Sequence, residues 1–516
     1  MRWFAALLGL SLFSPVAAPA DDPLAKRIEA IIDGPAYKQA RWGICVIDAK
    51  TGAAVYERDA EKLIVPASVT KLYSCAAAMI AYGADHKFVT PVYARGTITG
   101  KGVLKGDLIL VASGDLAFGG RTTKDGTLAF KDHDHSYANG GLFDAELTGT
   151  NPVAALEDLA KQVKAAGITE ITGEVLIDDR LFAAVQGTGS GPSAVSPIVL
   201  NDNMLDIIVT PGEKPGDRAT VTYRPETAAI AKDAEVTTGE VGSATSILLN
   251  SAGPAHFTVR GKIAAKERTH IRSYATEEPA GFARAVFIET LRKEGLRVEA
   301  AVARAARLDL PREGYADLKK VAEHTSPPLS ETLKVTLKVS HNLYASTLPC
   351  LLAAKAGKTT LEEGLREQRK ILKKLGVPVE TISFAGGAGG AAADCVTPRA
   401  TVELLRSLMK RDDWPKFRAG LPSLGVDGTL VGVVSDDSPA RGKVAAKTGT
   451  LSWSDGLNGR VLLKSKALAG VMTTKDGREL IVALFVNDVP LPAGVGPTRE
   501  GKVLGKLCEI LYEDVR

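Results

Sequence analysis

The chain has 516 residues, of which 45% are hydrophobic and 24% are charged. This is the composition of a globular protein, and the length is too great for one ordinary domain. The formal net charge is only +4 and the sequence holds no long basic run, which argues against a nucleic-acid-binding protein. Aromatic residues make up 5%, so a stacking platform for sugars or bases is not favoured either.

The first 20 residues have the pattern of a secretory signal peptide. Arg2 provides the positive start, residues 4–13 are apolar, and Ala18 and Ala20 are the small residues expected before a cleavage site. We therefore expect cleavage near Ala20 and a periplasmic or secreted protein. A buried N-terminal helix is the alternative interpretation. No later segment has 18 uninterrupted apolar residues, so no transmembrane segment is expected.

The cysteines show neither a C-x-x-C pair nor the spacing of a zinc site, and we expect no metal and no cofactor. Export would permit disulfides. The odd number leaves at least one thiol unpaired, and the pairing stays open. The five residues are Cys45, Cys75, Cys350, Cys395 and Cys508.

Elements of both kinds are predicted along the chain from periodicity and turn residues. The N-terminal part reads as a strand, a turn, a strand and a helix, over residues 42–48, 50–52, 53–57 and 72–82. The middle of the chain is predicted to contain a strand over 106–115, a polar glycine-rich loop over 119–141, a helix over 152–166 and a strand over 171–178. A small β module over 204–275 and a helix over 277–295 follow. The C-terminal part is predicted as helices over 328–375 and 399–410, strands over 468–474 and 479–486, and a last helix around 503–511.

Ser68 and Lys71 form the first of three short motifs. Ser68 directly precedes the predicted helix, so its oxygen lies near the positive end of the helix dipole. A lysine three residues later lies one turn further on the same face. The spacing brings an amine within reach of a hydroxyl, as an activated serine nucleophile requires.

The second motif is Ser340-His341-Asn342, between predicted helices, and the third is Lys447-Thr448-Gly449, on a predicted strand near the C-terminus. Each motif alone is weak evidence for an active site, because Ser-x-x-Lys recurs at Ser407 and Lys-Thr-Gly recurs at Lys50. Ser407 falls inside a predicted helix and Lys50 in a hairpin turn, so both copies are interpreted as structural. The order and context of the three motifs favour a common active site.

In this order the motifs resemble those of the low-molecular-mass class C penicillin-binding proteins, the secreted D-alanyl-D-alanine carboxypeptidase/endopeptidases. The resemblance extends to Pro66-Ala67-Ser68, to Asp427-Gly428-Thr429-Leu430 before the last motif, and to Lys447-Thr448-Gly449-Thr450-Leu451. Asn201-Asp202-Asn203 and residues 106–115 resemble the insertion that marks this class.

The resemblance implies an α/β (α+β) fold: a penicillin-binding transpeptidase-like domain with an antiparallel sheet flanked by helices, interrupted by a large, mainly β insertion. We expect the catalytic domain to comprise residues 21–90 and 320–516, because the motifs lie in these two blocks. The inserted region, 91–319, is expected to form two small subdomains, the second over about 204–275.

The implied activity is that of a serine D-Ala-D-Ala carboxypeptidase/endopeptidase, which acts on peptidoglycan stem peptides through an acyl-enzyme on Ser68. Lys71 would take the Ser68 proton, which requires a pKa lowered by burial or by a neighbouring cation such as Lys447. Ser340 would relay a proton to the leaving amine. Asn342 would orient Lys71 or the substrate amide.

The resemblance also implies an oxyanion hole formed by the backbone N–H groups of Ser68 and Thr450. Lys447 and Thr448, with Gly449 and Thr450, would bind the terminal carboxylate of the substrate. β-Lactams are expected to act as covalent inhibitors by acylating Ser68.

The chain departs from the family pattern in two places. Gly386-Gly387-Ala388-Gly389-Gly390 stands where an Asp-Gly-Ser-Gly segment is usual, so the side chains of that loop lose any expected role. The segment between Leu451 and Leu468, which includes Trp453, is longer than expected.

Three alternatives stay open on the sequence. A β-lactamase is disfavoured by the chain length and by the absence of a Glu-x-x-Leu-Asn motif. An esterase of related fold is the second. A non-catalytic wall-binding protein is the third, although binding alone would not require two lysines beside a serine.

Two histidine positions have other interpretations. His133 and His135 could be metal ligands, but the charged run around them favours a solvated loop. His341, between Ser340 and Asn342, is interpreted as a filler position and not as a catalytic base.

Overall fold

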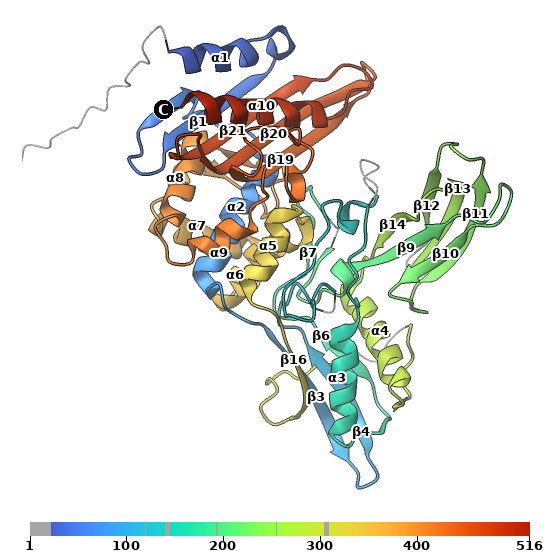
Figure 1. The fold of residues 1–516 in the computed structure, drawn as a ribbon. Coiled ribbons are helices and arrows are strands. Elements are labelled where there is room, and N and C mark those ends of the chain that lie inside the picture. The colour runs from blue at the N-terminus through green and yellow to red at the C-terminus, as the bar shows by residue number, and fades with distance from the viewer. Residues whose placement is uncertain are drawn as a thin grey trace, which may run out of the picture.

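The computed structural model describes residues 22–118, 120–139, 145–191, 194–253, 255–303 and 309–515. The predicted signal peptide lies outside these ranges. Within them, no helix has both the length and the apolar character that crossing a membrane would require. The fold is mixed α+β, as predicted, with antiparallel sheet and helices in separate layers (Figure 1).

A five-stranded antiparallel sheet joins the two ends of the chain (Figure 1). Its order is β19-β20-β21-β1-β2, so the first hairpin of the chain extends a sheet made by the last three strands. β19 is an edge strand whose outer side makes an isolated antiparallel bridge between Ala445 and Ser423, near its start. The bounds are β1 Arg41–Asp48, β2 Ala54–Arg58, β19 Val444–Asp455, β20 Arg460–Thr473 and β21 Glu479–Pro490.

The two faces of this sheet pack against different helices. Side chains alternate along a strand, and in β1 Ile44 and Val46 join one apolar core while Cys45 and Ile47 join another. The first face is covered by α1 (Pro23–Ile32) and α10 (Thr498–Asp514) (Figure 1). The helices on the side of the second face are α2 (Thr70–Tyr82), α5 (Leu329–Lys338), α6 (Asn342–Lys355), α7 (Leu361–Lys374), α8 (Pro398–Leu408) and α9 (Trp414–Gly420).

α2 lies in the middle of the helical layer and is buried from Thr70 to Met79. Its residues are small or apolar on every side of the helix, which is the pattern of a helix enclosed by other elements. This burial matters because Lys71 lies in the first turn of α2 and shares its dry surroundings.

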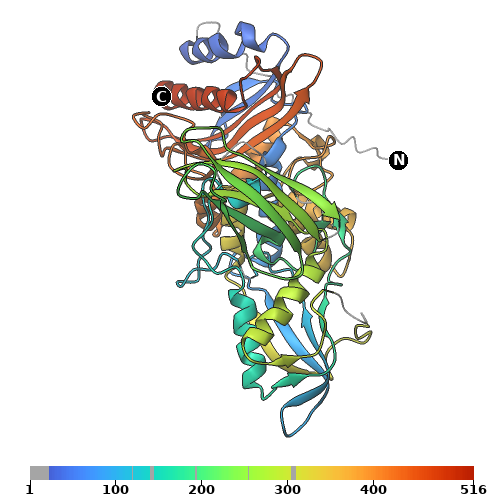
Figure 2. The same ribbon diagram turned by 90° about the vertical axis from the view of Figure 1, so that its right-hand side faces the viewer.

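A second sheet is formed by strands that lie between residues 89 and 325 (Figure 2). This sheet is mixed, because β4 pairs antiparallel with β3 but parallel with β5 and β6. α3 (Ala154–Ala165) and α4 (Pro279–Lys293) share its apolar core. The strands are β3 Val89–Ile98, β4 Val103–Val111, β5 Glu170–Ile171, β6 Val175–Asp178, β15 Arg297–Val298 and β16 Lys319–Thr325.

Residues 204–275 form two three-stranded sheets, drawn in green in Figure 2. Ile207 and Phe257 of this module belong to the same apolar core as Leu110 and Ile288. The module is therefore packed onto β4 of the second sheet and onto the helix α4. Its strands are β9 Met204–Thr210, β10 Thr220–Arg224, β11 Ala231–Gly239, β12 Ser246–Gly253, β13 His256–Ala264 and β14 His270–Ala275.

Short elements complete the described chain. Two small two-stranded sheets pair β7 (Val185–Gln186) with β8 (Ala194–Val195) and β17 (Ile382–Ser383) with β18 (Cys395–Val396). The 3-10 helices are η1 Pro35–Tyr37, η2 Ala67–Val69, η3 His135–Tyr137, η4 Asn201–Asn203, η5 Val379–Thr381 and η6 Gly428–Leu430.

Most predicted elements are present, but the single strand predicted over 171–178 is wrong. The chain forms β5 and β6 there, separated at Gly173. A Cβ at Gly173 would lie 2.4 Å from Asp107 Oδ1, and the N–H of Glu174 donates to the same oxygen at 2.7 Å. This local contact with β4 bends the segment, and no alternation pattern reveals it. β20 and β21 are also longer than predicted, because the β19–β20 hairpin extends to Asp455 and Arg460.

We propose that residues 91–319 are the insertion within a catalytic domain of residues 21–90 and 320–516. In support, β3 and β16, which leave and re-enter the catalytic part, pair with each other near these positions. The five cysteines are all free, and four of them are buried while Cys395 is half-buried. They act in the structure as small apolar side chains.

Candidate active site

Ser68 is the middle residue of η2, which leads directly into α2. The residue before it, Ala67, has a φ of 46°, in the left-handed region that non-glycine residues rarely adopt. Ser68 is half-buried, so its hydroxyl can be reached from outside. The helical structure begins at Ala67, earlier than the predicted start at residue 72, because η2 leads directly into α2.

Lys71 is fully buried and its ammonium position has three polar neighbours. Its Nζ lies 2.7 Å from Ser68 Oγ, 2.8 Å from Asn342 Oδ1 and 3.0 Å from the carbonyl oxygen of Ala388. Burial lowers the pKa of Lys71 to about 7. Of the two causes considered from the sequence, burial therefore accounts for the lowered pKa without a neighbouring cation.

These three neighbours match the needs of a neutral lysine. A neutral amine has two N–H donors and one lone pair, whereas an ammonium has three donors. The oxygens of Asn342 and Ala388 can only accept, and only the hydroxyl of Ser68 can donate. A neutral Lys71 is thus oriented so that its lone pair faces the Ser68 proton, which is the arrangement of a general base and its nucleophile.

The glycine-rich loop supplies the Ala388 carbonyl, and a buried carboxylate braces the loop. Asp394 accepts from the N–H of Ala385 and from the N–H of Ala391, both at 2.9 Å. Burial raises the pKa of Asp394. No motif in the sequence marks Asp394, although it is the single acidic residue in an otherwise glycine- and alanine-rich stretch.

Close backbone approach explains the glycines of this loop. Gly389 has a φ of 85°, and a Cβ on it would lie 1.9 Å from the carbonyl oxygen of Ala67. A side chain at this position would push the loop away from the turn that carries Ser68.

The second motif connects α5 to α6. Asn342 is the first residue of α6, and Ser340 has a φ of 62°, which turns the chain between the two helices. The Ser340 carbonyl oxygen accepts a hydrogen bond from the Tyr137 hydroxyl at 2.5 Å. His341 is buried, stacks on Tyr344 with ring centroids 3.8 Å apart, and accepts from the Tyr344 N–H as the N-cap of α6. The interpretation of His341 as a filler position is therefore wrong, because its ring holds the start of α6.

The third motif lies on the edge strand β19, with alternate residues facing opposite sides. Lys447 is fully buried, and its Nζ donates to the Thr448 carbonyl oxygen at 2.7 Å. Burial, and then the neighbouring Lys71, lower the pKa of Lys447 well below its usual value. The Thr448 hydroxyl donates to Thr429 Oγ1 at 2.7 Å. Thr429 belongs to the segment Asp427-Gly428-Thr429-Leu430, which precedes this motif in the sequence.

Lys466, on β20, belongs to no motif in the sequence but lies beside the third motif. It lies directly opposite Thr450 in the β19–β20 ladder, and its Nζ donates to Thr450 Oγ1 at 2.8 Å. Burial lowers the pKa of Lys466 to about 8, so this amine is an ammonium at neutral pH. The cross-strand register that brings it to Thr450 is a pairing that no local motif encodes.

The three motifs thus meet around Ser68, while their second copies lie elsewhere. Ser68, Lys71 and Asn342 are hydrogen-bonded, and Lys447 lies close enough to Lys71 for Lys71 to contribute to lowering the pKa of Lys447. Ser407 is part of α8, and Lys50 belongs to the turn between β1 and β2. The structural interpretation of these two copies agrees with where they lie.

The expectation that His135 lies in a solvated loop is wrong. His135 is buried between two carboxylates, at 2.8 Å from Asp202 Oδ2 and 2.6 Å from Asp206 Oδ1. Asp134, His135 and Asp202 bring ligand-type atoms within 4.8 Å of one another. The Arg121 guanidinium, however, binds both Asp134 and Asp202, so positive charge already occupies this cluster.

Comparison with known proteins gives a consistent result. The profile of the D-Ala-D-Ala carboxypeptidase 3 (S13) family matches residues 24–503. A D-alanyl-D-alanine carboxypeptidase of Actinomadura sp. (strain R39) is 28% identical over 460 residues, covering 85% of this chain and 78% of the relative. The D-alanyl-D-alanine carboxypeptidase DacB of Haemophilus influenzae is 24% identical over 441 residues, covering 82% and 80%.

Solved structures show the same fold. The crystal structure of penicillin binding protein 4 (dacB) from Haemophilus influenzae superposes with a TM-score of 0.67 at 20% identity, covering 92% of this chain and 97% of that chain. The same protein in complex with a β-lactam also gives a TM-score of 0.67, at 21% identity and with coverage of 95% and 99%. The predicted transpeptidase-like fold is thereby confirmed.

Replacement of Gly449 by alanine should destabilise the site. A Cβ at this position would lie 2.5 Å from the Pro66 carbonyl oxygen and 3.2 Å from the Ala67 Cβ, so β19 would have to move away from the turn that carries Ser68. Overpacking of this kind costs roughly 1–3 kcal/mol. We expect Gly449→Ala to lower the melting temperature measured by circular dichroism.

Gly456→Ala, at the tip of the same hairpin, is the matched control, because a Cβ there meets no atom within 4 Å. Equal melting temperatures for the two variants would contradict the close approach of β19 to Pro66.

Proposed function

This chain belongs to the D-Ala-D-Ala carboxypeptidase 3 (S13) family, and we propose that Ser68 is the nucleophile with which it hydrolyses peptidoglycan stem peptides ending in D-Ala-D-Ala. The observation that carries the proposal is the buried Lys71, whose lone pair is directed at the Ser68 hydroxyl by two acceptor oxygens. Cleavage of D-alanyl cross-links by the same site is the endopeptidase form of this reaction.

Acylation would begin as Lys71 takes the Ser68 proton while Oγ attacks the carbonyl carbon of the penultimate D-Ala. The C–N bond then breaks, and the departing amine of the terminal D-Ala takes a proton that Ser340 relays. Water attacks the resulting ester, and Ser68 recovers its proton. The proton that Lys71 first removes leaves on the amine of D-Ala, and the proton that Ser68 recovers comes from the attacking water, which Lys71 deprotonates in turn.

The backbone N–H groups of Ser68 and Thr450 are proposed as the oxyanion hole. Ser68 lies where a helix begins, so N–H groups in this region have no partner within the helix. Thr450 lies on an edge strand, where alternate N–H groups point away from the sheet. Two fixed donors of this kind typically contribute several kcal/mol to the stabilisation of a tetrahedral intermediate.

The terminal carboxylate of the substrate is proposed to bind along β19. Lys447 and Thr448, with Thr450, provide the donors, and Gly449 allows β19 to lie against the Ser68 turn. Lys466 adds an ammonium beside Thr450. Charge-assisted hydrogen bonds are the strong kind, and they would favour substrates with a free C-terminal carboxylate.

β-Lactams are proposed to acylate Ser68 by the same route, since opening of the ring amide replaces cleavage of the peptide. The protein is proposed to act in the periplasm or outside the cell, where peptidoglycan lies. A β-lactamase would release the penicilloyl group rapidly, and an esterase would turn over esters that lack a carboxylate. A binding protein without activity would not form the adduct at all.

Ser68→Ala should abolish covalent labelling by a fluorescent penicillin, because the acylated oxygen is removed. Ser407→Ala is the matched control, since it removes the serine of the second Ser-x-x-Lys copy in α8 and should be labelled like the wild type. Labelling is read from denaturing gels and the adduct is located by mass spectrometry. Persistent labelling of Ser68→Ala would refute the assignment.

The rate of acylation by benzylpenicillin should fall as the pH drops below about 7. The pKa of Lys71 is lowered to about 7, so at lower pH the amine is protonated and cannot take the Ser68 proton. We expect a decrease that approaches tenfold per pH unit on the acid side, measured by stopped-flow kinetics. A rate that still rises tenfold per unit up to pH 9 would mean that Lys71 keeps an ordinary pKa or is not the base.

Lys466→Met should lower kcat/KM for a peptide ending in D-Ala-D-Ala by about tenfold or more, the effect of one charge-assisted hydrogen bond. The same peptide with a C-terminal amide should change by less than about threefold, because a neutral end gains little from the ammonium. Lys464→Met is the matched control, since this lysine of the same strand binds Asp488 instead.

Equal losses on the acid and the amide would show that Lys466 supports the strand and does not act on the carboxylate.

A further inference from the structure

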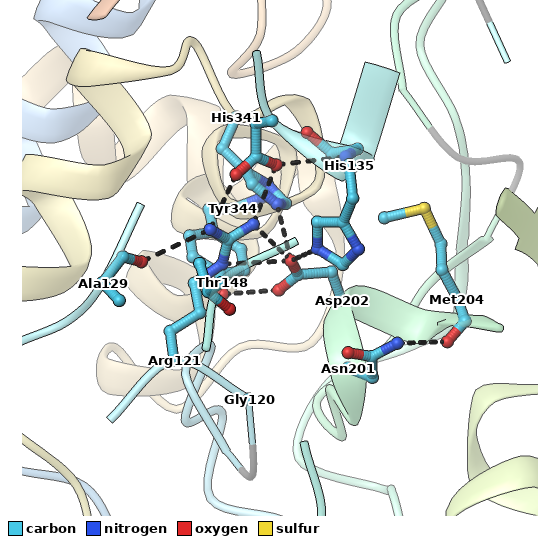
Figure 3. A network of polar contacts seen from close by, with 12 residues as sticks. Gly120, Arg121, Ala129, His135, Thr148, Asn201, Asp202, Met204, His341 and Tyr344 are labelled. Carbon is cyan, nitrogen blue, oxygen red and sulfur yellow. Dashed lines mark hydrogen bonds and ion pairs between the residues drawn. The ribbon is translucent and has the colours of Figure 1, made fainter. Parts of the chain in front are cut away.

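The inserted region contacts the second motif through a buried polar cluster centred on Asp202. In Figure 3 the side chains of Arg121, His135, His341 and Tyr344 converge on this carboxylate. Asp202 Oδ1 accepts from the Tyr344 hydroxyl at 2.6 Å. Asp202 Oδ2 accepts from Arg121 Nη2 at 2.6 Å and from His135 Nε2 at 2.8 Å, and it lies 3.3 Å from His341 Nε2.

Two of these partners belong to the catalytic part of the chain. His341 and Tyr344 flank Asn342 at the start of α6, and Asn342 Oδ1 is one of the acceptors that orient Lys71. A carboxylate from the insertion therefore holds the helix turn that carries a catalytic side chain.

A second contact from the insertion fixes Ser340 itself. The Tyr137 hydroxyl donates to the Ser340 carbonyl oxygen at 2.5 Å. Ser340 has the left-handed φ of 62°, a conformation that needs support from its surroundings because its side chain has a Cβ. Tyr137 is buried enough for its pKa to be raised beyond the usual range, so its hydroxyl keeps the proton that it donates.

The loop that carries Tyr137 also reaches the third motif. Asp132 Oδ1 accepts from the N–H of Gly428 at 2.6 Å. The neighbouring Thr429 is the partner of the Thr448 hydroxyl. Residues 132–137 of the insertion are thus linked to both motifs that complete the site around Ser68.

The Asp202 cluster is built as a rigid, charge-balanced unit. Burial alone would lower the pKa of His135, but the carboxylates of Asp206 and Asp202 raise it to about 10, so His135 is cationic. His341 is neutral at physiological pH, since burial lowers its pKa. Three cations then face three carboxylates: Arg121, His135 and Arg224 against Asp134, Asp202 and Asp206.

The backbone around Asp202 is also held in an unusual form. Asn201, Asp202 and Asn203 have φ values of 46°, 55° and 56°, all left-handed. Asn and Asp tolerate this region better than other residues with a Cβ. The Asn201 amide donates to Met204 O at 2.8 Å and to Asp206 Oδ2 at 3.1 Å, which locks the turn that presents Asp202 to α6.

Packing alone does not fix the second motif on this side. A cavity of about 290 Å³ lies between the insertion and the start of α6, and its lining includes Tyr137, Asp202, His341 and Asn342. Side chains next to open space have room to shift, so directed hydrogen bonds determine where they lie.

We propose that Asp202 and Tyr137 are positioning residues, through which the insertion sets the placement of Asn342 and Ser340 relative to Lys71. This proposal rests on the function proposed above. The insertion then contributes to catalysis by positioning Asn342. Without its contacts, Asn342 moves away from Lys71 while the helix that follows Ser68 stays in place. Neither residue is proposed to touch the substrate.

The test uses the full-length protein and variants that each remove one oxygen. Tyr137→Phe and Tyr344→Phe delete the hydroxyls that bind Ser340 and Asp202. Tyr315→Phe is the matched control, because its hydroxyl binds Asp178 within the insertion. The second-order rate of acylation by benzylpenicillin is measured for each, together with the melting temperature.

We expect Tyr137→Phe and Tyr344→Phe to acylate about tenfold more slowly than the wild type, and Tyr315→Phe to match it, at melting temperatures similar for all three. The acid limb of the pH profile should also move to lower pH in the two site variants. The reason is that the ammonium form of Lys71 loses an acceptor when Asn342 shifts. A merely structural defect would leave this limb in place.

Asp202→Asn provides a stronger perturbation, since it leaves Arg121 and His135 without their shared carboxylate. If this variant folds, we expect its acylation rate to fall at least a further tenfold. Should it fail to fold, the two tyrosine variants still decide the question. If both behave like Tyr315→Phe, the positioning role is overturned. If the wild type itself is not acylated, the proposed function fails, and the two failures are thereby distinguishable.

Discussion

The burial of Lys71 is the constraint on which the rest of the site depends. A lysine that is fully enclosed loses the hydration of its ammonium form, and its pKa falls to about 7. The amine then has one lone pair and two N–H groups to place, and the fold provides one hydroxyl and two carbonyl-type oxygens at 2.7–3.0 Å. The position of each surrounding element can be understood as a means of keeping this environment dry and these oxygens fixed.

Three separate parts of the chain meet that requirement. α2 encloses Lys71 in a helix of small and apolar residues, and the glycine-rich loop presents the Ala388 carbonyl because Asp394 braces it. The loop departs from the family pattern in its side chains, yet its contact with Lys71 is made by the backbone. The altered residues therefore leave this contact intact. The edge strand β19 comes close to the Ser68 turn because Gly449 lacks a Cβ.

The part of the chain between β3 and β16 contributes the remaining side of the site. Its charged cluster is buried, and isolated charges in such surroundings would be very unfavourable. Pairing three cations with three carboxylates removes that cost and leaves a polar unit with directed contacts to α6. A buried ionic network is weak support for stability as such. Its value here is geometric, since it specifies one orientation of the insertion relative to the second motif.

The meeting of Ser68 and Lys71 with the two further motifs could be predicted from the sequence, because each motif is a short run with a recognisable order and spacing. The helices and most strands could be predicted as well, since their periodicity is local. Asp394, Lys466 and the Asp202 cluster could not, and His135 and His341 were misread. Lys466 lies 16 residues from its partner Thr450 and Asp202 lies 142 residues from Tyr344, whereas Asp394 matters because its loop reaches Lys71, 317 residues from Ala388. The sequence by itself determined which chemical groups the site contains. Only the tertiary structure decided how deeply each side chain is buried, how the strands are paired in register and which hydrogen-bond partners each group has, and these set the protonation state and the orientation of the groups.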